Sequence, residues 1–115
     1  MQKSGGTGEG GVLVRSKENY HQPVGVDLIE KIANSVCKKY KTPWVPDIMI
    51  MPNAKRRWGC YYYSRKLITL NLPTRLGNLL HELAHHITRC RYGNVESHGI
   101  LFKNILKQLF DDYNV

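Results

Sequence analysis

The chain of 115 residues is long enough for one small domain. Its composition, 42% hydrophobic and 23% charged, is that of a soluble globular protein. No apolar run approaches the roughly 20 residues that span a bilayer, and the Gly-rich polar start lacks the apolar core of a signal peptide. We therefore expect a cytoplasmic monomer without membrane contact, located in the host cytoplasm if the chain is viral.

The formal net charge of +8 bears on the partner. Basic clusters lie at 38–41, 55–57 and 89–91 and could face phosphate groups. Two interpretations stay open, namely non-specific contact with nucleic acid or a solvated basic surface without a dedicated partner. The three cysteines form no Cys-x-x-Cys pair, which argues against a disulfide framework and a zinc ribbon.

We predict a flexible N-terminal arm over residues 1–22, because glycines crowd its start. Residues 23–115 then form the domain. Within it, apolar spacing predicts a first helix from Asp27, as N-cap, to about Lys41, ended by Pro43.

The middle of the chain predicts strands. Residues 47–51 form a short apolar run that ends at a proline. The runs 57–63 and 66–72 are rich in aromatic and β-branched residues and flank Ser64-Arg65, which predicts a β-hairpin.

Two helices complete the chain. The first is expected from a Thr74 cap to about Arg89, and the second is expected after a Ser97 cap. The last helix has a predicted buried stripe, made of Ile100, Leu101, Ile105, Leu109 and Phe110. This order predicts an α+β domain with a short three-stranded sheet of antiparallel type.

The segment His81-Glu82-Leu83-Ala84-His85 carries the clearest chemical signal. Residues four apart share one face of a helix, so both imidazoles can reach one Zn²⁺ ion. Glu82 is rotated by about 100° and can instead lean over a water on the metal. This is the arrangement of zinc hydrolases, in which the carboxylate acts as general base.

A catalytic zinc needs a third protein ligand. His98, which follows a turn-rich loop, is our first candidate, and Glu96 is the alternative. His86 should point away from the metal because it is rotated from His85.

With the element His98-Gly99-Ile100-Leu101-Phe102-Lys103, this motif resembles the SprT-like, or Spartan-type, metalloproteases. The segments 57–60 and 68–71 also look like the hairpin of that family, and the likeness covers about residues 27–110. It implies a zinc-dependent metalloendopeptidase of the zincin type with ligands His81, His85 and His98. Better-known members cleave DNA-attached proteins and often carry a zinc ribbon, which this sequence lacks. The resemblance therefore implies a minimal protease domain acting on protein substrates, with DNA-associated proteins as one class.

In zincins the strand above the active-site helix binds substrate as an added strand. We expect strand 66–72 to do so, with Thr69 and Asn71 as contacts, unless it is simply packed sheet. Tyr92 or Tyr113 is a weaker candidate for stabilising the oxyanion. The alternative function is a zinc-stabilised nucleic-acid-binding or regulatory module without proteolytic activity. Glu82 argues for the protease, since a structural zinc site has no use for it.

Overall fold

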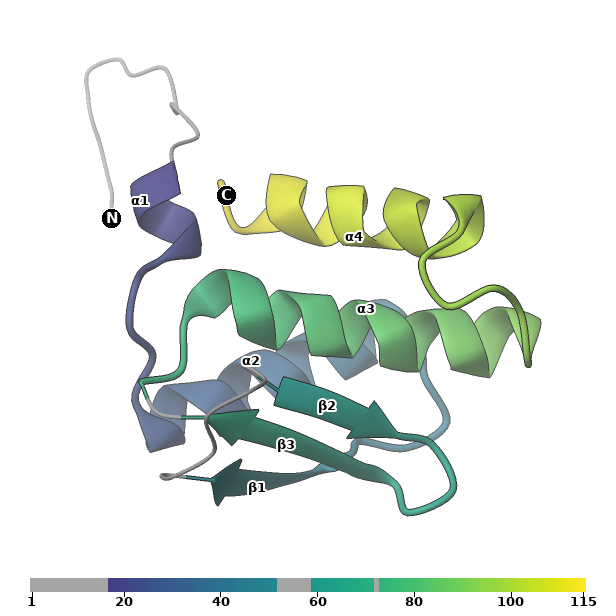
Figure 1. Cartoon of the computed structure of the whole chain (residues 1–115), viewed down its shortest axis with the longest axis horizontal. Coiled ribbons are helices and arrows are strands. Elements are labelled where there is room, and N and C mark those ends of the chain that lie inside the picture. The colour runs from purple at the N-terminus through teal and green to yellow at the C-terminus, as the bar shows by residue number, and fades with distance from the viewer. Residues whose placement is uncertain (1–16, 52–58, 72) are drawn as a thin grey trace.

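The computed structural model describes residues 17–51, 59–71 and 73–115 (Figure 1). Along the chain, helices come before and after the three strands of a small sheet. The predicted order of one helix, three strands and two helices is confirmed, and a short additional helix precedes it. The elements are α1 (Lys17–Tyr20), α2 (Val26–Lys39), β1 (Asp47–Met51), β2 (Gly59–Tyr62), β3 (Leu67–Asn71), α3 (Leu76–Tyr92) and α4 (Ile100–Asp112). The domain is thus α+β, as expected.

The sheet has the order β1-β3-β2, so β3 is its central strand. β2 and β3 pair antiparallel and form the predicted hairpin. β1 pairs with β3 in parallel, with Asp47 opposite Leu67. The sheet is therefore mixed rather than of antiparallel type, because the hairpin inserts its second strand beside β1 in the same direction.

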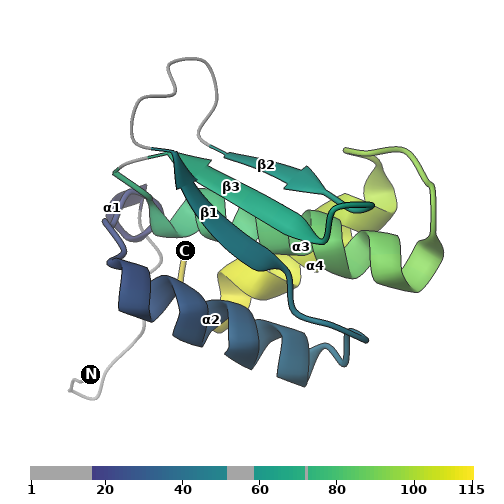
Figure 2. The same ribbon diagram turned by 90° about the horizontal axis from the view of Figure 1, so that it is seen from below.

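Helix α3 lies at the centre of the molecule. It packs against β2 and β3 on one side and against α4 on the other, while α2 covers the same face of the sheet (Figures 1 and 2). Its apolar side chains are fully buried at five positions, namely Leu79, Leu80, Leu83, Ala84 and Ile87. Burying so many side chains makes α3 a rigid support for whatever its remaining faces carry.

The helix starts differ from the predicted ones. None of α2, α3 and α4 has a side-chain cap, and their N-cap residues are Gly25, Arg75 and Gly99. The three residues predicted as caps have other positions or contacts. Asp27 lies inside the first turn of α2, the Thr74 hydroxyl donates to the Asn71 carbonyl, and Ser97 precedes α4 by three residues. Ile100 was also assigned to the buried stripe wrongly, since it is 69% exposed at the start of α4.

Part of the predicted N-terminal arm lies within the described residues and is packed. The Tyr20 ring lies directly on Gly77 of α3, and its hydroxyl donates to Asn78 Oδ1 at 3.1 Å. Asn19 Nδ2 donates to the Asn114 carbonyl at 2.6 Å, which links this segment to the C-terminal end. Residues 1–16 lie outside the described residues. Among the described helices, none is long and apolar enough to cross a membrane.

Candidate metal centre

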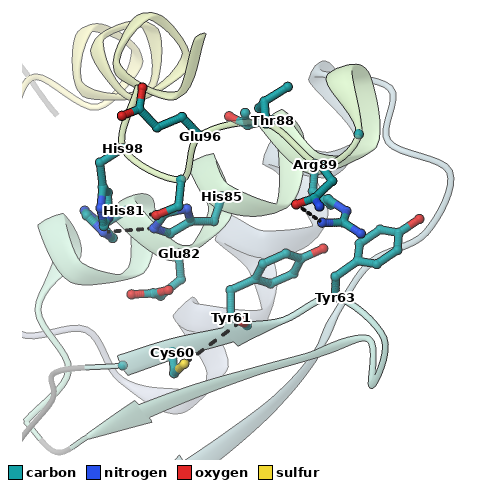
Figure 3. A pocket seen from close by; sticks show the side chains of 15 residues that line it. Cys60, Tyr61, Tyr63, His81, Glu82, His85, Thr88, Arg89, Glu96 and His98 are labelled. Carbon is teal, nitrogen blue, oxygen red and sulfur yellow. Dashed lines mark hydrogen bonds between the residues drawn. The ribbon is translucent and has the colours of Figure 1, made fainter. Parts of the chain in front are cut away.

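Three histidines converge at one side of α3 (Figure 3). His81 and His85 are one turn apart on that helix, and His98 comes from the segment that leads into α4. The Nε2 atoms of His81 and His85 are 3.2 Å apart. One nitrogen from each of the three rings lies within 4.8 Å of the others, a spacing that allows all three to bind one ion.

Phe102 forms the support of this triad. Its ring stacks on His85 with centroids 4.3 Å apart, and it meets His81 and His98 edge-on at 5.1 Å each. It is 2% exposed. Sequence reasoning did not place Phe102 in the site, although its position four residues after His98 on a predicted helix was a usable signal.

His81 and His85 are held in the form that binds a metal. Burial lowers the pKa of His81, and burial with the neighbouring imidazoles lowers the pKa of His85 to about 4. Both rings are therefore neutral near pH 7, and neutral imidazole is the ligand form. Three imidazoles with an exposed side at His98 suit zinc, so this triad could hold that metal.

Glu82 lies beside the triad, between the histidines and β2 (Figure 3). It is 7% exposed, which is unusual for a glutamate. Gly59 of β2 passes close to it, and a Cβ placed at Gly59 would lie 3.4 Å from Glu82 Cγ and 2.7 Å from the Thr69 carbonyl oxygen. Glycine is thus required by the close approach of the Thr69 carbonyl on β3, whereas the distance to Glu82 is an ordinary van der Waals contact. The sequence alone did not indicate this role.

A cleft of about 520 Å³ opens in front of these groups. Its walls are the exposed face of α3, strand β2 and the loop 93–98. β2 lies at the edge of the described sheet, and its residues Gly59, Cys60 and Tyr61 line this cleft. The structure does not bring Thr69 and Asn71 to the cleft, because β3 is paired on both sides and Asn71 is 5% exposed.

His86 does not join the triad and is fully buried on another face of α3. Its Nε2 lies 2.9 Å from the Trp44 carbonyl oxygen, which can only accept, so Nε2 carries the proton. Its Nδ1 then accepts from the Tyr61 hydroxyl at 2.9 Å. The first bond anchors the segment before β1 to α3 and the second anchors the hairpin, and the ring was correctly predicted to point away from the metal position.

The remaining candidates lie at different distances from the centre. Glu96 lines the cleft but does not belong to the group of converging ligand atoms. Tyr92 and Tyr113 are absent from the described lining of the cleft, whereas Tyr61 and Tyr63 contribute to it. Of the site residues predicted from the sequence, the structure brings together the three histidines and Glu82.

Comparison with known proteins found no matching family model and no matching curated relative. The structure is similar to the crystal structure of the metallopeptidase zymogen of Methanocaldococcus jannaschii jannalysin. The two share a TM-score of 0.52 and 21% sequence identity over 70% of this chain and 79% of that chain. The likeness is one of fold, that is, of the arrangement of helices and sheet.

Proposed function

We propose that this protein is a zinc-dependent metalloendopeptidase of the SprT-like type, which hydrolyses peptide bonds of protein substrates. The observation that carries the proposal is the buried carboxylate of Glu82 beside three converging imidazoles, at the floor of an open cleft. A site that only stabilised the fold would have no need of this carboxylate. The metallopeptidase fold of the similar structure supports the same conclusion.

The residues have separate tasks in this mechanism. Zinc held by His81, His85 and His98 would lower the pKa of the attacking water and polarise the scissile carbonyl. Glu82 accepts the proton that the water loses as it attacks the carbonyl carbon. It then delivers this proton to the amide nitrogen, which leaves as an amine when the C–N bond breaks. Gly59 of β2 packs against the buried Glu82 side chain, which helps to hold the carboxylate beside the reacting bond.

The outer edge of β2 is the proposed binding site for the substrate backbone. An extended peptide can add to an edge strand of a sheet through main-chain hydrogen bonds. Cys60 and Tyr61 of β2 line the cleft, so a strand added there would pass over the histidines. This moves the proposed substrate strand from β3, with Thr69 and Asn71, to its neighbour.

The test compares the zinc-loaded protein with a Glu82→Gln variant on a DNA-binding protein substrate, with and without DNA. Glu82→Gln should lose at least about a hundredfold in cleavage rate, because it cannot accept the proton. Glu30→Gln is the matched control, since Glu30 is exposed on α2. Equal cleavage by wild type and Glu82→Gln would rule out the mechanism, and bound zinc without any cleavage would favour the non-proteolytic module.

The same experiment addresses nucleic acid. Lys38 and Lys41 are exposed at the end of α2, while the cluster 55–57 lies outside the described residues. Contact with DNA therefore stays a prediction based on charge. Cleavage that does not respond to DNA would leave the protease and remove the nucleic-acid partner.

A further inference from the structure

Arg89 occupies one end of the cleft, away from the histidines (Figure 3). It follows His85 by one turn on the same face of α3 and is half-buried. Its guanidinium lies over the Tyr63 ring, 4.4 Å from the centroid, and donates to Asn94 Oδ1 at 3.0 Å. Contacts from the hairpin and from the loop thus fix a cation in the wall of the cleft.

The Arg89 guanidinium has no carboxylate partner among the described residues, because the ion pair recorded among them joins Lys39 and Asp112. The acidic side chains in the described lining are Glu82 and Glu96, and both carboxylates lie toward the histidine end of the cleft (Figure 3). Asn94 uses one of the five N–H donors of the guanidinium. A fixed guanidinium with free donors matches the geometry of a carboxylate, which it can bind through two parallel hydrogen bonds.

The contacts between β2 and α3 define the direction of the cleft. Gly59 lies beside Glu82, the Tyr61 hydroxyl reaches His86, and Tyr63 lies under Arg89. Strand and helix therefore run in the same direction. A peptide paired antiparallel to β2, the more stable of the two pairings, runs the opposite way. Its residues before the scissile bond then pass Arg89.

The position along the peptide follows from standard dimensions. Four helical residues separate Arg89 from His85, a rise of about 6 Å. Two residues of an extended strand cover about the same length. We propose that the Arg89 end of the cleft binds the side-chain carboxylate of an Asp or Glu about two residues before the scissile bond. This specificity rests on the proposed peptidase function, which defines that bond.

The first test reads cleavage sites by mass spectrometry in a proteome-derived peptide mixture. Wild type should enrich Asp and Glu at the second residue before the cut. Arg89→Gln should lose about tenfold of that preference, and Arg89→Glu should shift it toward Lys. Arg91→Gln is the matched control, because Arg91 lies two residues away over Tyr40 and does not line the cleft. A uniform loss of rate without a change in preference would overturn the proposal, as would acid enrichment after the cut.

The second test separates this proposal from the peptidase function. It measures binding to Glu82→Gln protein of eight-residue peptides blocked at both ends, with randomised flanks and either Glu or Gln at one position. The Glu set should bind about tenfold more tightly, and adding Arg89→Gln should abolish the difference while adding Arg91→Gln should not. This result supports the carboxylate site even if wild type cleaves nothing. Equal binding of both sets, or no binding, overturns it.

Discussion

Phe102 connects the hydrophobic core to the three imidazoles, and this single ring contacts all of them. Metal ligands depend on neighbours that fix their orientation, and loss of such a neighbour typically lowers affinity tenfold or more. We expect Phe102→Leu to weaken zinc binding about tenfold. The change keeps most of the apolar volume, so its effect on folding should stay within about 1.5 kcal/mol. Competition with a fluorescent zinc chelator would measure the affinity.

Two further variants serve as references for the zinc affinity of Phe102→Leu. His98→Ala removes a ligand and should weaken zinc binding more than Phe102→Leu. Glu96→Ala should change the affinity by less than about twofold, because Glu96 does not belong to the converging group. A larger loss in Glu96→Ala than in His98→Ala would assign the third ligand to Glu96 instead.

Among the elements, α1 packs on α3 through the Tyr20 ring, which also meets Phe110 of α4. The Tyr20 ring lies on Gly77, where a Cβ would collide with it. Gly77→Ala should therefore displace Tyr20, break its hydrogen bond to Asn78 and lower the free energy of unfolding by about 1–3 kcal/mol. Hydrogen exchange of residues 17–22 and urea unfolding would record the effect.

Gly25→Ser is the control for this change. Nothing lies within 4 Å of a Cβ at Gly25, and serine is a favoured N-cap residue. It should leave the stability unchanged or raise it. Unchanged exchange of residues 17–22 in Gly77→Ala would show that Tyr20 does not hold this segment.

The elements also show which parts of the fold and of the site could be predicted from the sequence. The spacing of His81 and His85 indicated the helix and its metal-facing side, because a repeat of four has one meaning on a helix. His98 was the first candidate for the third ligand because it follows a turn-rich loop, and the family resemblance also selected it over Glu96. Strand order was not predictable, since the apolar run 47–51 does not record which strand it pairs with or in which direction. Gly59 was missed for the same reason, because its importance depends on how closely the paired strand β3 brings the Thr69 carbonyl.

At the scale of the whole molecule, buried neutral histidines make stability depend on pH. Burial lowers the pKa of His81, His85 and His86, and that of His85 falls to about 4 from an unfolded value of 6.5. Between these values the unfolded chain binds more protons than the folded one, so acid favours unfolding. The metal-free protein should lose thermal stability as the pH falls from 6.5 to 4.5.

Thermal unfolding followed by circular dichroism would test this. His85→Gln should show a shallower decline, because it removes the imidazole whose pKa falls to about 4 in the folded protein. A midpoint that stays constant over this range in wild type would contradict the prediction.

The third histidine differs from the other two in its support. His81 and His85 are fixed on a helix whose core side chains are buried, whereas His98 is exposed at the end of the loop 93–98. A bound ion could therefore be released when this loop alone swings outward, with the core still folded. The lifetime of the bound metal, and the rate at which one metal replaces another, would then depend on the motion of a few residues rather than on unfolding of the domain.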